Sequence, residues 1–157
     1  MEGSRIGAGT MTSLRGKRVN MPFKKMREIL AHLEIEPVWS ELFEFLADQV
    51  DHIVWLADVD SNLIFINDYW VEITGISKEK AVLENQWKNC IPHIDLELLL
   101  ELAELSTITE EPLSIAYKIV DPNTDITRKL TGKVYPFKDN LGKVRFWVGI
   151  SKEVDNV

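Results

Sequence analysis

The chain has 157 residues, of which 45% are apolar and 27% are charged, a composition typical of one globular domain with some additional length. Its one cysteine excludes an intramolecular disulfide framework and is typical of a reducing compartment, so we expect a cytoplasmic protein. The sequence shows no uncharged apolar run near the ~18 residues of a membrane span and no apolar signal-peptide stretch at its start.

The net charge of −7 is distributed unevenly. Residues 1–27 hold seven Lys/Arg and one acid, so residues 28–157 carry a net charge of −13. An acidic body does not attract nucleic acid, and we expect no nucleic-acid partner. Residues 1–21 are rich in Gly and Ser and lack aromatic residues, which predicts a disordered basic tail. Contact of this tail with phosphate or an anionic membrane stays open as an alternative.

Two amphipathic helical patterns fill residues 22–50, which we expect to form an N-terminal helical segment. In the first, every third or fourth residue is apolar: Phe23, Met26, Leu30 and Leu33. Pro37 suits the first turn of the second helix. The apolar stripe of that helix consists of Trp39, Leu42, Phe43, Leu46 and Val50.

The period then changes to that of short strands and short helices. Residues 52–67 form two β-rich runs around the polar turn DVDSN, which predicts a hairpin. A short helix follows, with Asn67 or Asp68 as its N-cap and Gly75 as its stop. Ser77 is expected to cap the next helix.

The last part predicts one longer helix and three strands. Asp95 is the expected N-cap of the helix DLELLLELAELS. The strand-like runs LSIAYKIV, TRKLTGKVYPF and KVRFWVGISKEV are separated by turn-rich DPNTD and KDNLG. Five antiparallel strands with helices inserted in the middle make an α+β domain.

This order of elements resembles the PAS domain over residues 51–154, followed by a short tail at 155–157. The segments that carry the resemblance are ADVDSNLIFINDYWVEITGIS, NQWKNCIPHIDLELLLEL and the three final strands. The resemblance implies a five-stranded antiparallel sheet in the order 2-1-5-4-3, with short helices on one face. It also implies a possible small-molecule cavity under these helices. In this family the helix before the domain commonly packs on the other face of the sheet and joins a dimer interface.

Strand alternation assigns residues to the two faces of this sheet. Against the family pattern, Trp147, Gly149 and Ser151 face the cavity, and the side with Val144, Phe146, Val148 and Ile150 faces away. The expected cavity wall is Trp55, Ala57, Trp70, Trp87, Leu99, Tyr117, Leu130, Val134, Trp147 and Ser151. Plain core packing is the alternative for most of them. Tyr117 and Ser151 are the stronger candidates for contacting a ligand, because an inward polar tip needs a partner.

The opposite face of the sheet is apolar and needs a cover. Val54, Leu56, Tyr135 and Phe137 are expected to share this face with the final strand. The helical stripe from Trp39 to Val50 is the expected cover, either on its own sheet or on that of a second copy. The expected interface residues are Trp39, Leu42, Phe43, Leu46, Val50, Phe146 and Val148.

Cys90 and His93 stand three residues apart. They supply two ligands where a zinc site needs about four, so we expect no metal site. Some PAS sensors ligate haem iron with one histidine near the long helix, which leaves His93 as a haem ligand in one alternative. The DVDSN turn fails as a calcium loop, because Leu63 and Tyr69 stand where glycine and glutamate are needed.

The flavin-binding photosensor subclass of PAS domains has an Asn-Cys pair that continues Arg-Phe-Leu-Gln. Here Asn89 and Cys90 are followed by IPHI, and the alignment of the loop places Trp87 at the photoreactive position. The polar contacts to flavin would fall on Tyr117, Leu130 and Ser151, and an apolar Leu130 cannot hydrogen-bond the ring. An FMN cofactor is therefore not expected.

Two functional hypotheses follow. The first is a sensory signalling module that binds a small molecule and signals to a partner protein or a dimer mate. The second is a ligand-free interaction module that dimerises through residues 22–50 and the outer sheet. An enzyme is not expected, because the sequence contains no nucleotide-binding loop and no nucleophile–base pair.

Overall fold

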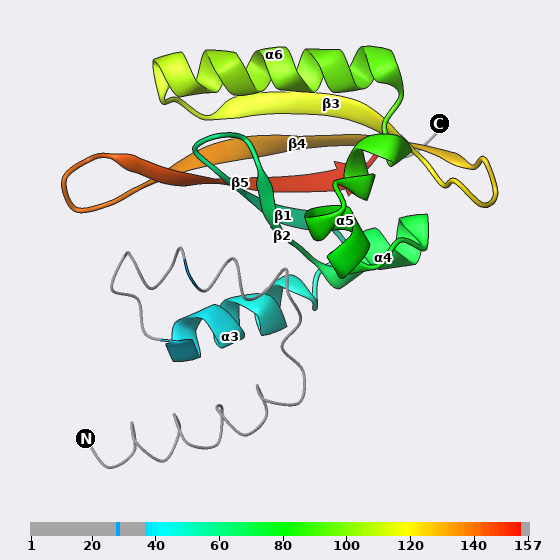
Figure 1. The fold of residues 1–157 in the computed structure, drawn as a ribbon, viewed down its shortest axis with the longest axis horizontal. Coiled ribbons are helices and arrows are strands. Elements are labelled where there is room, and N and C mark those ends of the chain that lie inside the picture. The colour runs from blue at the N-terminus through cyan, green and yellow to red at the C-terminus, as the bar shows by residue number, and fades with distance from the viewer. Residues whose placement is uncertain (1–27, 29–36, 155–157) are drawn as a thin grey trace.

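The fold is described from a computed structural model, which covers Glu28 and residues 37–154 (Figure 1). The predictions of a basic tail over residues 1–21 and of a helix with Phe23, Met26, Leu30 and Leu33 lie outside these residues. So do residues 155–157. Strands and helices from residue 53 to residue 153 fall within the range that resembles the PAS domain.

Residues 37–154 form an α+β structure with one sheet and five helices of different length. The elements are α3 (Pro37–Ala47), β1 (Ile53–Asp58), β2 (Leu63–Ile66), α4 (Asp68–Thr74), α5 (Lys78–Leu83), the 3-10 helix η1 (Gln86–Cys90), α6 (His93–Thr109), β3 (Leu113–Val120), β4 (Thr127–Lys138) and β5 (Val144–Glu153).

The sheet confirms the expected topology. Its five strands are antiparallel and run in the order β2-β1-β5-β4-β3. Figure 1 shows α6 running along β3, while α3 lies on the opposite side of the molecule. The sheet therefore separates two layers of helices, as a two-sided α+β domain requires.

Strand alternation divides the buried side chains into an inner and an outer core. In β1, Ile53 and Ala57 join the inner core under the helices α4 to α6, with Trp55 packed against it. Val54 and Leu56 join the outer core, together with Phe146 and the partly buried Val148. This confirms the expected assignment of β1 and the middle of β5, because successive side chains of a strand point to opposite faces.

Val144 is the exception on β5, because it belongs to the inner core and not to the outer side predicted for it. The register explains this. Phe137 pairs with Phe146 and Lys138 with Val144, so Arg145 has no partner of its own on β4. Such a bulge inserts one residue and reverses the alternation beyond it. The ring of Phe137 remains on the outer side, stacked on Phe146 with 4.6 Å between centroids.

Helix α3 covers the outer core, but with a different face from the one its apolar stripe predicts. Ala47 is buried in the outer core, and Phe43 contacts Phe65 edge-to-face with 5.3 Å between ring centroids. Four of the five stripe residues are instead exposed: Trp39 (59%), Leu42 (40%), Leu46 (54%) and Val50 (39%). The buried positions Ser40 and Ala47 are small, which lets the helix backbone come close to its neighbours.

Two of the expected helix boundaries are confirmed. The Ser77 hydroxyl accepts a hydrogen bond from the Lys80 N–H at the start of α5. Gly75 ends α4 in the left-handed conformation, with φ of 70°, and its N–H donates to the Val71 carbonyl.

The expected cap of α6 is wrong. The helix begins at His93, two residues before Asp95, and Pro92 is its N-cap. The Asp95 carboxylate accepts a hydrogen bond of 2.7 Å from the backbone N–H of Lys118 in β3. It therefore fastens the helix to the edge strand of the sheet.

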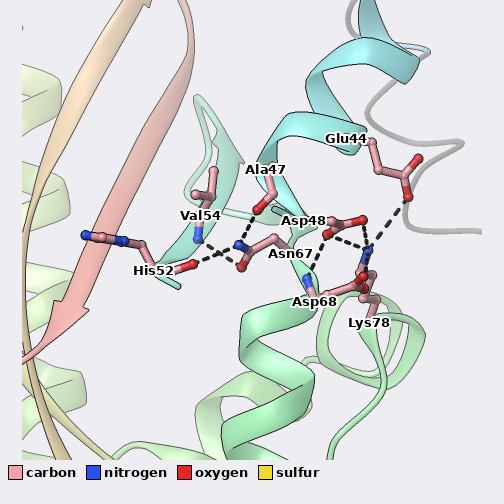
Figure 2. Close-up of polar contacts among 8 residues, drawn as sticks. All are labelled: Glu44, Ala47, Asp48, His52, Val54, Asn67, Asp68 and Lys78. Atoms are coloured by element: carbon pink, nitrogen blue, oxygen red, sulfur yellow. Dashed lines mark hydrogen bonds and ion pairs between the residues drawn. The ribbon is translucent and has the colours of Figure 1, made fainter. Parts of the chain in front are cut away.

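Asn67 is the N-cap residue of α4, but its side chain makes no capping bond. The buried amide instead joins three other parts of the chain (Figure 2). Its Nδ2 donates to the carbonyls of Ala47 at 2.7 Å and His52 at 2.8 Å, and its Oδ1 accepts from the N–H of Val54 at 3.0 Å. The end of α3, the following loop and β1 are thus held by one side chain.

A second polar cluster lies beside Asn67 and centres on Lys78 (Figure 2). Its ammonium group is close to Asp68 at 2.8 Å, Asp48 at 3.1 Å and Glu44 at 3.7 Å. Burial lowers the pKa of Lys78, but the carboxylates of Asp68 and Asp48 outweigh it, and the pKa is raised overall. This cluster connects α3 to α4 and α5.

Replacement of Asn67 by alanine is expected to lower the free energy of unfolding by about 2–4 kcal/mol, because it leaves buried carbonyl and N–H groups without partners. Urea unfolding followed by tryptophan fluorescence measures the loss. Asn62→Ala is the matched control, since Asn62 is exposed and its side chain bonds Asp58 within its own turn. A loss at Asn67 no larger than the control's ~0.5 kcal/mol would contradict the assigned role.

Candidate functional site

A cavity of about 120 Å³ lies between the inner face of the sheet and the helices α4, η1 and α6. Its wall is almost wholly apolar and comes from every strand and these three helices. The lining residues are Ile53, Trp55, Ala57, Ser61, Leu63, Ile66, Trp70, Trp87, Ile91, Leu99, Leu100, Leu102, Ala103, Ser106, Leu113, Ile115, Tyr117, Val134 and Trp147.

The structure brings together eight of the ten side chains expected at this wall: Trp55, Ala57, Trp70, Trp87, Leu99, Tyr117, Val134 and Trp147. It does not place Leu130 and Ser151 in the lining. Leu130 is 1% exposed within the inner core, and Ser151 is buried behind Tyr117.

Several lining residues were not predicted, although the strand and helix periods of the sequence place them on the same faces as predicted ones. Ile53 and Ile115 stand two residues before Trp55 and Tyr117, and so share the face of their strands. Leu102, Ala103 and Ser106 follow Leu99 at helical spacing on α6. Ser61 lies in the hairpin turn and carries no signal of this kind.

The indole ring of Trp55 packs against Gly149 of the neighbouring strand, with which Trp55 pairs in register. A Cβ atom at Gly149 would stand 2.0 Å from Cε2 of the indole ring, closer than atoms can approach. Glycine is therefore required here so that the tryptophan can pack over the β5 backbone and form this part of the wall.

Tyr117 and Ser151 are paired with each other. The tyrosine hydroxyl donates to the serine Oγ at 3.1 Å, and both side chains are buried. Burial raises the pKa of Tyr117 to about 12, against the smaller, opposite effect of the bond to Ser151. The Tyr117 hydroxyl, which was expected to need a ligand, thus has Ser151 as its partner within the protein.

Two other polar atoms at the wall have no such partner. Nε1 of Trp70 in α4 and Nε1 of Trp87 in η1 are both buried and make no hydrogen bond with the described residues. An indole N–H is a donor only, and an unpaired buried donor costs about 1–3 kcal/mol. Both indole rings line the cavity, so these two N–H groups are buried donors without a partner beside it.

Cys90 lies at the end of η1 and is outside the lining. It is fully buried, and its Sγ lies 3.9 Å from the carbonyl of Gln86. Burial, with a smaller effect of the Asp121 carboxylate, raises the pKa of the thiol to about 11. Such a thiol has little thiolate character and is a poor nucleophile or metal ligand.

His93 does not fit the haem alternative. It is the first residue of α6, its side chain is 82% exposed, and its Nε2 pairs with Glu97 at 3.0 Å. It is not among the residues that line the cavity. Within residues 37–154, no group of three or more His, Cys, Asp or Glu side chains is arranged to hold a metal ion.

None of the helices that the structure describes is long and apolar enough to span a membrane.

Cys90 gives a direct test of this packing, because it is the single cysteine of the chain. At about pH 8 we expect alkylation by iodoacetamide to be at least about a hundredfold slower in the native protein than in the urea-unfolded chain. The native rate should increase up to about pH 11. Since the folded pKa is raised, the thiol's contribution to stability is present below its ordinary pKa of 9.0 and is lost as the pH rises through about 11. Equal rates in native and unfolded protein would contradict the buried position.

No family model and no curated protein matches the sequence, whereas many solved structures match the fold. The PAS domain of the fruit-fly ELK potassium channel has a TM-score of 0.56 and 13% identity, over 74% of this chain and 97% of that one. The N-terminal domain of a diguanylate cyclase with a PAS/PAC sensor, from Marinobacter aquaeolei, has a TM-score of 0.55 and 13% identity, over 65% and 94% of the two chains.

A LOV protein from Rhodobacter sphaeroides also matches, with a TM-score of 0.57 and 12% identity over 74% of this chain and 67% of that one. Because a LOV protein is among these structures, the absence of a flavin stays a prediction. Identities this low establish the fold alone. The strand order, the helices on the inner face and these superpositions agree, and the chain therefore has the PAS fold.

Proposed function

We propose that this chain is a sensory or regulatory module that binds a small molecule in its cavity and signals through α3 and the sheet to a partner or dimer mate. Structural neighbours from a diguanylate cyclase with a PAS/PAC sensor and from a potassium channel support a signalling role. The proposal depends above all on helix α4, which contacts both the cavity and the outer layer.

Helix α4 carries Trp70 in the cavity wall, 2% exposed. Two residues earlier, Asp68 accepts from Lys78 and its backbone N–H donates to Asp48, directly after α3. Asn67, at the N-cap of the same helix, bonds the last residue of α3. A ligand that shifts Trp70 would therefore displace the polar contacts that position α3.

Strand β1 supplies a second physical route between the layers. Trp55 and Ala57 line the cavity, and the alternating Val54 and Leu56 pack in the outer core. Both sets of side chains belong to the backbone of β1. A ligand that changes the twist of this strand at the cavity therefore also moves the side chains in the outer core. A ligand shifts the population of such states by its difference in affinity for them.

A binding role is proposed here in preference to a catalytic one. The cavity wall formed by the described residues contains no charged side chain, and its tyrosine is bonded to a serine. General acid–base or nucleophilic catalysis needs a titratable group within hydrogen-bond reach of the reacting atoms.

Native mass spectrometry of the purified chain, together with its visible absorption spectrum, tests the proposal. We expect a mass excess over the polypeptide that is lost on denaturation. A Soret band or a flavin spectrum would identify a cofactor that the sequence disfavours. An unliganded protein that also takes up no compound from a metabolite library would contradict the proposal.

A matched pair of variants links binding to the cavity. Ala103→Leu adds three carbon atoms to the wall from α6, and Ala116→Leu makes the same change on the exposed side of β3. We expect the mass excess to disappear in the first variant and to persist in the second. Retention of the ligand in both would place it elsewhere on the protein.

The second candidate function is that of an interaction module, and one observation favours it. Exposed large apolar side chains stand on α3 and on the strands β4 and β5, and together we call them the outer apolar patch: Trp39 (59%), Leu42 (40%), Phe45 (60%), Leu46 (54%), Tyr135 (41%), Phe137 (41%) and Ile150 (39%). Patches of this kind mark protein–protein contacts. Of the residues expected at the interface, Phe146 is buried in the outer core, while Phe43 and Val148 pack against it and are partly buried.

Sedimentation analysis of the full chain tests this candidate. We expect a dimer that Leu46→Glu converts to a monomer, because a charge in an apolar interface loses its hydration without gaining a counter-ion. Leu141→Glu is the control, since Leu141 lies in the β4–β5 turn and is 92% exposed. A monomeric wild-type chain, or a dimer that survives Leu46→Glu, would contradict the role of the outer apolar patch.

A further inference from the structure

We propose that the ligand of the cavity is a compact, uncharged and largely apolar molecule of about one ring, with a hydrogen-bond acceptor that pairs with the indole N–H groups of Trp70 and Trp87. This inference rests on the proposed function, because it specifies the chemistry of the same cavity. Four observations support it: the volume of the cavity, the absence of charge from its described wall, the pairing of its buried hydroxyl groups, and two buried indole donors without a partner among the described residues.

The volume sets the size of the ligand. At about 120 Å³ the cavity is somewhat smaller than the ~150 Å³ of an engineered apolar cavity that takes up benzene. A ligand the size of about one ring matches this volume.

The wall sets the charge of the ligand. None of the described residues that line the cavity is acidic or basic. A carboxylate or ammonium group inside it would lose its hydration and meet no counter-ion, which strongly opposes binding. Aromatic side chains of Trp55 and Trp147 and aliphatic ones of the α6 leucines favour an apolar ring in its place.

The hydroxyl groups of the wall are already paired or lie at its rim. Tyr117 donates to Ser151 at 3.1 Å, and the Ser106 hydroxyl donates to the carbonyl of Ala103 at 2.8 Å. Ser61 lies in the exposed hairpin turn. The hydroxyl protons of Tyr117 and Ser106 are therefore used within the protein, and neither group can donate to a ligand without breaking its bond.

Two of the four indole donors in the wall are buried without a partner among the described residues, and they come from different elements. Trp70 stands on α4 and Trp87 on η1, and Nε1 of each is buried without a partner among the described residues. Because indole N–H can only donate, the complementary group on the ligand is an acceptor. A carbonyl oxygen, an ether oxygen or a ring nitrogen is such an acceptor and carries no net charge.

Three probe molecules of equal size separate these features: acetophenone, α-methylstyrene and benzoate. The first carries a carbonyl where the second has an isosteric methylene, and the third carries a negative charge. Titrations followed by calorimetry and by the ¹H–¹⁵N signals of the five indole groups measure their binding. We expect acetophenone to bind about three- to tenfold more tightly than α-methylstyrene, and benzoate to bind most weakly.

The indole signals identify the donors. Acetophenone should shift the signals of Trp70 and Trp87 downfield, while α-methylstyrene leaves them where they are. Trp70→Phe and Trp87→Phe assign these signals and remove the donor while keeping a ring. Trp39→Phe, at a 59% exposed position on α3, is the control. We expect the preference for acetophenone to fall in the first two variants and to persist in the control.

Some results would contradict the proposed ligand chemistry and leave the proposed binding function intact. Equal affinity for acetophenone and α-methylstyrene, with unmoved indole signals, would overturn the role of the two donors and leave a ligand-binding cavity. Tightest binding of benzoate would overturn the argument from charge. If no probe binds and the purified chain carries no ligand, both proposals fail together. The comparison of isosteres in the wild-type protein decides the matter even if a tryptophan variant does not fold.

Discussion

The described structure depends on the amide of one buried asparagine. Asn67 fills the gap between the end of α3, the loop at His52 and the start of β1, and it bonds a backbone group of each. Helix α3 has 11 residues and buries little of its apolar stripe, so neither its length nor its packing would fix its position alone. Its place over the sheet comes from directional bonds to Asn67 and to the Lys78 cluster, which α4 and α5 supply.

Much of the fold follows from local sequence signals. The DVDSN turn, where the Asp58 carboxylate accepts from the N–H groups of Asp60 and Asn62, produces the hairpin that its composition predicts. Alternation on β1 correctly assigns Trp55 and Ala57 to the cavity, because strand geometry depends on the period alone. The strand order came from the resemblance to the PAS domain, since pairing between distant strands has no local signal.

The differences arise where tertiary contacts outweigh local patterns. Asn67 has the sequence context of a helix cap, but its amide instead bonds three backbone groups outside α4, and burial makes those bonds stronger. Asp95 likewise reaches the edge strand instead of its own helix. The face of α3 that docks contains Ser40 and Ala47, and a count of apolar residues cannot anticipate a preference for small ones. The bulge at Arg145, which turns Val144 inward, depends on pairing with β4.

The contact between Trp55 and Gly149 has a consequence for how such a cavity can diversify. The ring occupies the space that any side chain at position 149 would need, so the two positions cannot change independently. A larger residue on β5 becomes acceptable when the tryptophan on β1 is replaced by a small one, and the reciprocal exchange moves bulk from one strand to the other. Related chains with the same backbone could therefore reshape the pocket by compensating pairs of substitutions, and an engineer could follow the same route to accept a ligand of another shape.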